Sequence, residues 1–341
     1  MNTAELNAIA KAMVTKGKGL LAADESAPTV AKRFKKYNVD NTPDNRRAWR
    51  ELLLGTPGLS QYVSGAILYD ETIRQSTSDG TPFAQFMQRQ GMIPGIKVDT
   101  GAKDLALHPN EKVTEGLDGL RERLQEYHAM GARFCKWRAV ITIGAGIPSN
   151  FCIEANAHAL ARYSALCQEN GLVPIVEPEV LIDGDHSIET SYRVTFATLR
   201  ALFAELAEHR VAFEGTILKA SMVISGAQAQ KRAGVDQVAD ETVRCLVNTV
   251  PASLPGVVFL SGGQSPEEAT AHLNAMNVRH ANLPWPLSFS YSRALQEPVM
   301  AAWLGKAANT ATAQKELLKR ARFNALASLG KYQSQMEREA A

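Results

Sequence analysis

The chain has few cysteines and no long hydrophobic run. Its 341 residues include only four cysteines, which are far apart and form no C-x-x-C motif: Cys135, Cys152, Cys167 and Cys245. Cysteines scattered in this way are usually small buried residues, so we expect no disulfide framework. No segment reaches the roughly 18 apolar residues that a transmembrane helix needs, and the first residues lack the apolar stretch of a signal peptide. The sequence therefore predicts a cytoplasmic protein.

The sequence also lacks a strong excess of either charge. Lys and Arg total 37 and Asp and Glu total 35, which gives a formal net charge of +2. This balance does not favour nucleic acid or a membrane surface, and no basic run is interleaved with aromatic residues. The seven histidines form no H-x-H or H-E-x-x-H motif. We therefore expect no nucleic-acid partner, no membrane partner and no metal.

Short apolar segments alternate with longer segments of helical pattern. Eight candidate strands recur some 30 to 45 residues apart, and no G-x-G-x-x-G motif follows an early strand. Alternation of this kind indicates a parallel sheet covered by helices. Eight units fit a (β/α)8 TIM barrel, in the α/β class, better than an open dinucleotide-binding sheet. The predicted strands are 20–24, 63–69, 93–99, 134–141, 173–180, 215–223, 256–262 and 287–293.

Helix boundaries and domain organisation can also be predicted. Ser149 precedes a long helical segment, and the Ser-Pro-Glu-Glu stretch at 265–268 has the form of a capping box. No proline-rich or serine-rich linker divides the chain. We therefore predict one barrel domain over residues 1–341, with an N-terminal helix at 3–16 and a helical tail from about 311 to 341.

Polar or charged residues lie at the ends of seven of the eight predicted strands. The most unusual is Lys219, in the middle of the apolar segment GTILKASMVISG, because an ammonium loses hydration on burial. Lys136 and Arg138 form an i,i+2 pair on one face of their strand, as do Glu177 and Glu179. A barrel packed for stability alone uses Val, Ile and Leu, so the pattern favours an active site at the carboxyl ends of the strands. Any one pair by itself could be a structural ion pair.

Lys219 is the predicted nucleophile. Burial and a nearby Lys136 would both favour its uncharged amine, which can attack a carbonyl and form a Schiff base. Glu177, one strand earlier, is the predicted acid that removes water from the carbinolamine. Asp24 could act as a second base from the first strand; alternatively, it could cap the helix that follows.

Two segments are suited to binding phosphate. Ser261 and Gly262 lie in the LSGGQS segment between a strand and a helix, where backbone N–H groups can surround an anion. Arg293 ends the next strand, and phosphate sites of barrels commonly follow strands seven and eight. A weaker candidate for a second anion site consists of Ser26, Thr29 and Lys97.

The chain resembles class I fructose-bisphosphate aldolases over roughly residues 17–295. The motifs that carry the resemblance are, in order, GKGLLAADES, GIKVDTG, FCKWR, VPIVEPE, GTILKASMV, FLSGGQS and SFSYSRAL. The resemblance implies a TIM barrel that reversibly cleaves fructose 1,6-bisphosphate to dihydroxyacetone phosphate and glyceraldehyde 3-phosphate. It further implies a Schiff base, no metal or other cofactor, a place in glycolysis and gluconeogenesis, and a homotetramer.

The resemblance also implies roles for individual residues. It gives Lys219 the Schiff base, Glu177 the acid–base chemistry of the carbinolamine, and Asp24 the orientation of the reacting hydroxyl. Lys136 and Arg138 match groups that assist Schiff-base formation and substrate binding. The remaining matches are Glu179 beside Glu177, Ser261, Gly262 and Arg293 at the C1-phosphate, Ser26 and Lys97 near the C6-phosphate, Thr29 in place of a phosphate-contacting serine, and Arg33 as a flexible arginine near the mouth.

Three departures from the family pattern stand out. Ala27, Pro28 and Thr29 follow the DES motif where the family usually has Thr-Gly-Ser. Ser292 replaces a glycine that brings backbone close to phosphate, so serine must adopt a compatible backbone conformation there. The last tyrosine is Tyr332, whereas animal members end in a tyrosine that helps to exchange the C1 proton. We therefore expect slower proton exchange or a different group in that role.

Two other functions fit the same residues. One is a different Schiff-base lyase of the transaldolase type, which would act on a sugar monophosphate and need one anion site. The other is a non-catalytic protein that binds a sugar phosphate on an aldolase-like frame. The complete acid–base set argues against the second alternative, because binding alone would not require it.

Overall fold

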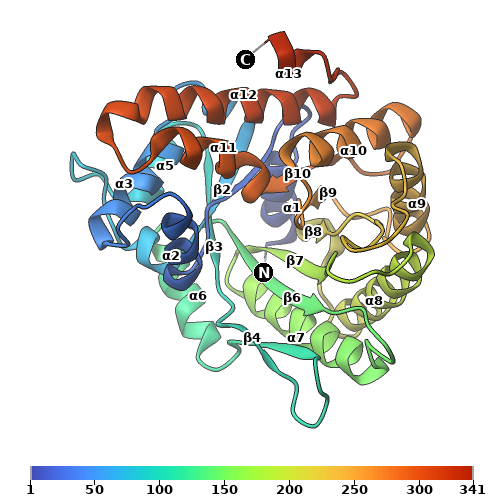
Figure 1. Cartoon of the computed structure of the whole chain (residues 1–341). Helices are drawn as coiled ribbons and strands as arrows, with labels where there is room; N and C mark the ends of the chain where they lie inside the picture. Colours follow the sequence, from blue (N-terminus) through green and yellow to red (C-terminus); the bar gives the residue numbers. More distant parts are fainter. Residues whose placement is uncertain (1, 340–341) are drawn as a thin grey trace.

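Eight parallel strands close into a barrel in the computed structural model, which describes residues 2–339. The strands are β1 (Gly19–Ala22), β2 (Val63–Leu68), β3 (Ile93–Lys97), β6 (Phe134–Ile141), β7 (Val173–Val180), β8 (Ile217–Ala220), β9 (Val257–Phe259) and β10 (Leu287–Tyr291). Each pairs with its neighbours in chain order, and β1 closes the ring by pairing with β10 and β2 (Figure 1). The prediction of a (β/α)8 barrel is confirmed.

Six of the eight predicted strands extended too far at their carboxyl ends, whereas 134–141 and 173–180 match β6 and β7. The segment predicted at 215–223 pairs only as far as Ala220, and the segment predicted at 256–262 only as far as Phe259. Polar residues that follow these strands have left the ladder at the rim of the barrel. Their backbone is therefore free to turn: Ser261 lies at the mouth, whereas Ser221 Oγ donates a hydrogen bond to the Val180 carbonyl oxygen at 3.0 Å.

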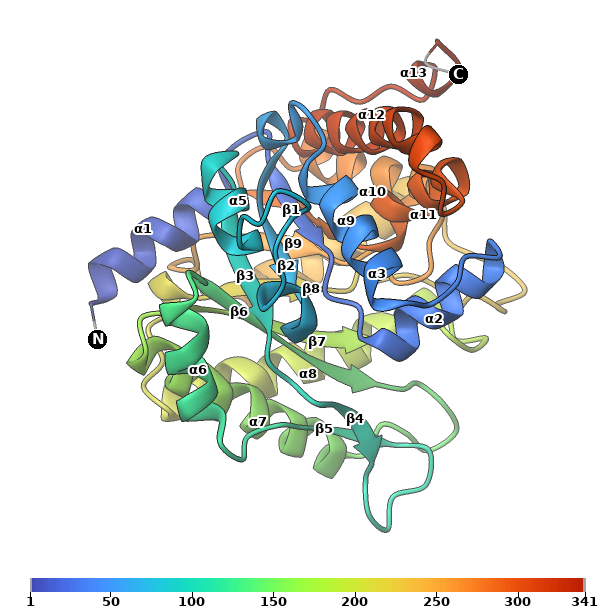
Figure 2. The same ribbon diagram turned by 90° about the vertical axis from the view of Figure 1, so that its left-hand side faces the viewer.

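Helices surround the strands on the outside (Figures 1 and 2). They are α1 (Thr3–Met13), α2 (Ala27–Lys36), α3 (Pro43–Leu54), α4 (Asp70–Ile73), α5 (Phe83–Arg89), α6 (Leu120–Ala129), α7 (Asn150–Glu169), α8 (Ile188–Glu208), α9 (Val235–Val247), α10 (Pro266–Arg279), α11 (Arg293–Trp303), α12 (Thr310–Ser328) and α13 (Met336–Glu339). Short 3₁₀ turns lie at Leu59–Gln61, Phe213–Gly215 and Ala307–Asn309. No helix between residues 2 and 339 is both long and apolar enough to cross a bilayer.

The sequence signals for helix starts work through real caps. Ser149 Oγ accepts a hydrogen bond from the Cys152 N–H at 3.1 Å, and Ser265 Oγ accepts one from the Glu268 N–H at 3.1 Å. The capping box at 265–268 is only half formed, because the Glu268 carboxylate accepts from Arg232 Nη2 at 2.8 Å. A tertiary partner has thus taken the side chain that would otherwise bond to the helix terminus.

Two regions differ from the sequence prediction. An antiparallel hairpin of β4 (Gly101–Asp104) and β5 (Lys112–Glu115) interrupts the barrel order between β3 and β6 and projects from it (Figure 2). The predicted tail is helical through α12 and again in α13, with a non-helical stretch between them, while residues 340–341 lie outside the described part. The assignment of residues 1–341 to one domain stays a prediction.

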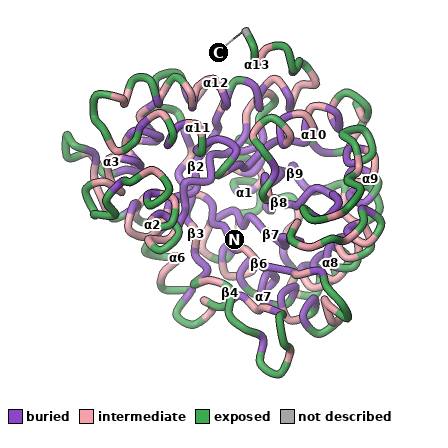
Figure 3. Tube along the Cα trace, viewed as in Figure 1, coloured by how far each residue is buried: buried purple, intermediate pink, exposed green. Residues whose placement is uncertain are grey.

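The amino-terminal end of the barrel interior is filled by apolar side chains. We call this layer the barrel floor; it consists of Leu20, Ile67, Phe134, Ile175, Ile217 and Val258, all fully buried. Helix α1 covers it with Leu6, Ala10 and Met13. Helix α2 lies at the other end of the barrel (Figure 2). Figure 3 shows the buried centre and the exposed outer surface of the helices.

The Phe134 ring fits in the floor because two of its neighbours are glycines. A Cβ at Gly65 would lie 3.2 Å from the Phe134 ring, and a Cβ at Gly95 would overlap that ring. Glycine at these two strand positions therefore provides the space that one large aromatic ring fills. The floor is thus a closely packed apolar layer on which the side chains nearer the carboxyl ends of the strands rest.

Candidate active site

Charged side chains form the layer directly above the floor. On β6 the floor residue Phe134 is followed two positions later by Lys136, and on β8 Ile217 is followed by Lys219. Residues two apart on a strand point to the same face, so these lysines also face the barrel axis. They lie nearer the carboxyl ends of the strands, where barrels hold their functional groups.

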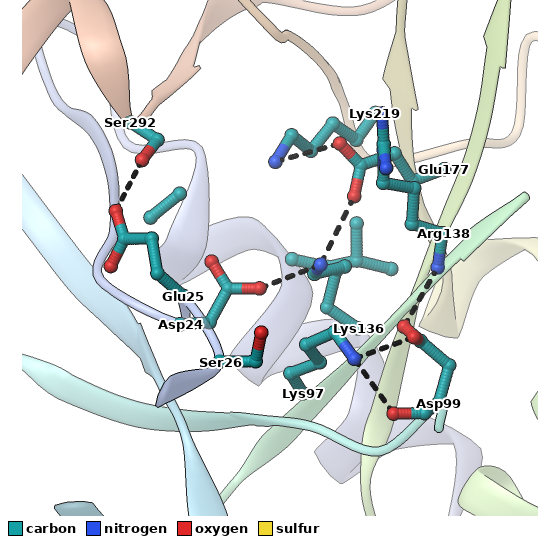
Figure 4. Close-up of polar contacts among 12 residues, drawn as sticks. Asp24, Glu25, Ser26, Lys97, Asp99, Lys136, Arg138, Glu177, Lys219 and Ser292 are labelled. Carbon is teal, nitrogen blue, oxygen red and sulfur yellow. Dashed lines mark hydrogen bonds and ion pairs between the residues drawn. The ribbon is translucent and has the colours of Figure 1, made fainter. Parts of the chain in front are cut away.

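Four of these side chains form one chain of ion pairs, which we call the central charge cluster: Asp24, Lys136, Glu177 and Lys219. Lys136 Nζ lies 2.6 Å from Asp24 Oδ2 and 3.4 Å from Glu177 Oε2. Lys219 Nζ lies 2.9 Å from Glu177 Oε1 (Figure 4). All four residues are buried. The Glu177 carboxylate therefore bridges the two lysines.

Pairing within the cluster outweighs the cost of burying charge. Burial by itself would raise the pKa of Asp24, but the ammonium groups of Lys136 and Lys219 bring that pKa below its ordinary value. The pKa of Glu177 is likewise lowered, because Lys219 and Lys136 together more than offset its burial. Burial opposes the charge of Lys136, yet Asp24 and Glu177 raise its pKa. At neutral pH both carboxylates are ionised and Lys136 is protonated.

Lys219 differs from the sequence expectation in its closest ionic contact. We expected repulsion from Lys136 to favour the uncharged amine, whereas the Glu177 carboxylate lies between the two lysines. Deprotonation of Lys219 therefore has a defined acceptor, the Oε1 atom of Glu177.

The cluster lines a cavity of about 520 Å³ that opens at the carboxyl ends of the strands. Eight Lys or Arg residues and five Asp or Glu residues line this cavity, so it suits an anionic ligand. All thirteen residues that the sequence singled out lie along it: Asp24, Ser26, Thr29, Arg33, Lys97, Lys136, Arg138, Glu177, Glu179, Lys219, Ser261, Gly262 and Arg293.

The turn after β9 has the backbone of an anion-binding loop. Gly262 and Gly263 have φ angles of +54° and +93°, which glycine adopts without strain. Arg293 reaches this turn, because a Cβ on Gly263 would lie 3.9 Å from Arg293 Nη2. Ser261 and Gly262 line the cavity beside it. A guanidinium and successive backbone amides thus lie at the same end of the cavity.

At the opposite end of the cavity, the Asp99 carboxylate binds groups from two neighbouring strands. Lys97 Nζ lies 2.6 Å from Asp99 Oδ1, and Asp99 Oδ2 accepts a hydrogen bond from the Arg138 backbone N–H at 3.2 Å (Figure 4). The Arg138 guanidinium forms an ion pair with Glu179. Lys97 and Arg138 are thereby fixed on neighbouring strands at the edge of the mouth.

The loop between β1 and α2 decides between the two roles considered for Asp24. Ser26, not Asp24, is the N-cap residue of α2, and the Asp24 carboxylate is used by Lys136. The capping alternative for Asp24 is therefore wrong. Ser26 Oγ lies 3.1 Å from Thr29 Oγ1, so these two hydroxyls are held together beside the cavity.

A model of the family described as "Fructose-bisphosphate aldolase class-I" matches residues 5–341. The chain belongs to this family. It is 62% identical over 333 residues to a "probable fructose-bisphosphate aldolase class 1" of Xanthomonas campestris, covering 97% of this chain and 99% of that protein. A cytosolic fructose-bisphosphate aldolase 4 of Arabidopsis thaliana is 52% identical over 97% of this chain and 84% of its own length.

Solved structures lead to the same family. A fructose-bisphosphate aldolase from Plasmodium falciparum, solved in complex with TRAP and a small-molecule inhibitor, superposes with a TM-score of 0.96 at 48% identity. The superposition covers 97% of this chain and 96% of the Plasmodium chain. The predicted family, function and enzyme class are confirmed: the chain is a class I fructose-bisphosphate aldolase, a lyase of glycolysis.

Sequence reasoning missed a second polar network beside the central one, which we call the Glu25 cluster: Glu25, Arg33, Arg50, Ser292 and Gln296. Glu25 is buried and forms ion pairs with Arg33 and with Arg50, the latter at 2.5 Å. Its Oε1 also accepts hydrogen bonds from Ser292 Oγ at 2.6 Å and Gln296 Nε2 at 2.8 Å. Burial alone would raise the pKa of Glu25, but Arg33 and Arg50 bring it far below its ordinary value.

The Glu25 cluster also explains the serine that departs from the family pattern. Ser292 has φ −105° and ψ −80°, so no left-handed backbone is required at this position. Its hydroxyl donates to Glu25 and accepts from Arg33 Nη2 at 3.1 Å. The only feature of the sequence that pointed to Glu25 was its position next to Asp24. No feature distinguished Arg50 from the other residues of its helical segment.

Proposed function

We propose that the residues around the central charge cluster cleave fructose 1,6-bisphosphate through a Schiff base on Lys219. The supporting observation is the position of the Lys219 amine, buried and 2.9 Å from a carboxylate inside a cation-rich cavity. A buried amine beside a proton acceptor can become nucleophilic and then receive acid catalysis from the same group. The products are dihydroxyacetone phosphate and glyceraldehyde 3-phosphate.

Glu177 moves the proton in the first half of the reaction. Its Oε1 accepts a proton from the Lys219 ammonium, and the neutral amine attacks the C2 ketone to form a carbinolamine. Glu177, now protonated, returns that proton to the C2 hydroxyl, which leaves as water and gives the iminium. Lys136 keeps its charge and supports the ionised carboxylates on either side.

Carbon–carbon cleavage then draws electrons into the iminium. Asp24 or Glu177 accepts the proton of the C4 hydroxyl, the C3–C4 bond breaks, and its electron pair forms an enamine attached to Lys219. Asp24 approaches from β1, across the cavity from β8, so it is placed to orient the reacting hydroxyl. Protonation of the enamine and attack of water then release the ketose fragment and restore the amine.

Two phosphate anchors hold the substrate across this site. The C1-phosphate is assigned to Ser261, Gly262 and Arg293 at the turn after β9. The other phosphate is assigned to Ser26, Thr29 and Lys97, with Arg33 and Arg138 on the same rim. Binding energy from both ends positions the reacting bond, which a monophosphate could do only in part. This arrangement favours the bisphosphate over a transaldolase-type substrate.

Borohydride trapping tests the assignment of Lys219. Reduction of the enzyme with dihydroxyacetone phosphate should fix the triose on the Lys219 peptide, as mapped by mass spectrometry, and Lys219→Met should abolish the adduct. Lys97→Met is the matched control, since it removes another lysine of the mouth and should leave the adduct on Lys219. An adduct on a different lysine, or none, would refute the mechanism.

The remaining parts of the proposal concern cofactor, assembly and location. We expect catalysis without a metal or other cofactor, because protein groups supply both the electron sink and the proton transfers. A homotetramer in the cytoplasm is the expected form, by analogy with the family and with the relative named cytosolic. Analytical ultracentrifugation of the full chain measures the assembly directly.

A further inference from the structure

A second group of chemically active side chains lies on helices that cover the outside of the barrel. His158 comes from α7, Glu205 from α8, and His209 follows α8 as its C-cap residue. One potential ligand atom from each lies within 4.8 Å of the other two, the only such group of three within residues 2–339. We propose that this triad binds one divalent transition-metal ion of the zinc class.

The Glu205 carboxylate lies between the two imidazoles. Its Oε2 is 3.0 Å from His158 Nδ1 and 3.6 Å from His209 Nδ1. The two rings meet edge to face, with centroids 4.9 Å apart. Two imidazoles and one carboxylate form a set of three protein ligands that zinc uses in four-coordinate sites, in which water takes the fourth position.

Backbone contact fixes the orientation of His209. Its Nδ1 lies 2.8 Å from the Glu205 carbonyl oxygen, one helical turn earlier. A carbonyl oxygen only accepts hydrogen bonds, so Nδ1 carries the hydrogen and Nε2 keeps its lone pair. A histidine ligand typically donates its other N–H to a carbonyl or carboxylate in this way, which aligns the metal-binding nitrogen.

The geometry requires only side-chain adjustment to close on an ion. Ligands about 2.0–2.1 Å from a tetrahedral zinc lie roughly 3.3 Å apart. Each of the three residues already offers one ring nitrogen or carboxylate oxygen within 4.8 Å of the other two. The side chains of His158, Glu205 and His209 are 53%, 31% and 22% exposed. His158 and Glu205, the two more exposed, have room to change rotamer. The ion would join α7 to α8, which already pack together (Figure 1).

The chain contains a natural comparison that lacks the second imidazole. His280 Nε2 lies 2.9 Å from Asp240 Oδ1, and the other oxygen of Asp240 is bound by Arg279 at 2.6 Å. This pair also joins a partly exposed histidine to a carboxylate, but the Arg279 guanidinium already binds that carboxylate. His280 is therefore the control for non-specific metal binding at a surface histidine.

Calorimetric titration of the chelator-treated full chain with ZnCl₂ tests the site. We expect one zinc ion per chain, at least about tenfold weaker binding in His158→Gln and in His209→Gln, and unchanged binding in His280→Gln. Zinc should also raise the Tm of the wild type and of His280→Gln, but not of the other two variants. Titration with Co²⁺ should give the visible absorption of a four-coordinate site only in the proteins that bind zinc.

Retained fructose 1,6-bisphosphate cleavage shows that each variant is folded, because the triad has no part in the proposed reaction. Equal zinc binding by the wild type and by the double variant H158Q/H209Q would overturn the proposal. So would a wild type that binds no zinc at micromolar concentrations.

Discussion

The floor and the mouth of the barrel are built on the same strands but have opposite chemistry. Phe134 and Ile217 lie in an apolar layer closed by α1, whereas Lys136 and Lys219, two residues further along β6 and β8, lie in a layer of ion pairs. The strand period of two keeps both layers directed at the axis. Displacement by two residues along a strand thus separates the part that stabilises the fold from the part that performs the chemistry.

The two layers also contribute differently to the free energy of folding. Full burial of one large apolar side chain stabilises the folded state by about 1.5–3 kcal/mol. A buried ion loses several kcal/mol of hydration, which pairing offsets only when geometry and hydrogen bonds are good. The floor should therefore control the free energy of unfolding, and the mouth should control activity with little net effect on stability.

The largest expected effect comes from removing the amine in the mouth. Lys219→Met keeps most of the length of the side chain, leaves Glu177 paired with Lys136, and should lower kcat/KM by on the order of 10⁴-fold or more. Chemical denaturation should show a smaller loss in the free energy of unfolding than the roughly 3–5 kcal/mol of a buried charge left without a partner, because Lys136 stays beside Glu177. The exposed Lys315→Met is the control and should change neither quantity. A large loss of stability in Lys219→Met would contradict the division between the layers.

The corresponding change in the floor is Phe134→Ala. We expect a loss of about 3–5 kcal/mol in the free energy of unfolding, because the ring leaves a cavity that the neighbouring Gly65 and Gly95 cannot fill. Below the unfolding transition, kcat should stay within a few-fold of the wild type. If kcat instead fell as steeply as in Lys219→Met, the floor would have a direct role in catalysis.

Glu25→Gln tests the network that adjoins the mouth. The substitution removes the negative charge shared by Arg33 and Arg50 and should destabilise the fold by about 3 kcal/mol at neutral pH. Because the pKa of Glu25 is lowered in the folded state, the stability from its charge is complete above the ordinary glutamate range and is lost as pH falls below it. Denaturation from pH 7 to pH 3 should therefore show wild type and variant converging in acid.

Arg293→Ala should have the smallest effect of the four, and a selective one. Loss of a charge-assisted contact to phosphate, worth about 1.5–3 kcal/mol, should raise KM by roughly 10- to 150-fold. Arg279→Ala, which removes a surface arginine paired with Asp240, serves as the control. An unchanged KM for fructose 1,6-bisphosphate would remove Arg293 from the phosphate site.

The sequence predicted those parts of the molecule that depend on local pattern. The alternation of apolar strands with capped helices predicted the barrel, and Lys219 stood out because a charge interrupts an apolar strand. The hairpin of β4 and β5 was missed because each strand has only four residues, β4 is largely exposed, and neither strand carries a hydrophobic alternation. The Glu25 cluster was missed because its members come from four separate segments.

The chain by itself determined which residues are chemically unusual, since strand period and burial cost are visible in the order of amino acids. Only the tertiary structure decided which charges meet. In the mouth, Glu177 bridges Lys136 and Lys219, and Asp24 forms an ion pair with Lys136 instead of capping a helix. On the outside, His158 of α7 contacts Glu205 of α8. The reason is physical. Coulombic and hydrogen-bond partners are set by distances in space, which closure of the barrel fixes and sequence separation does not.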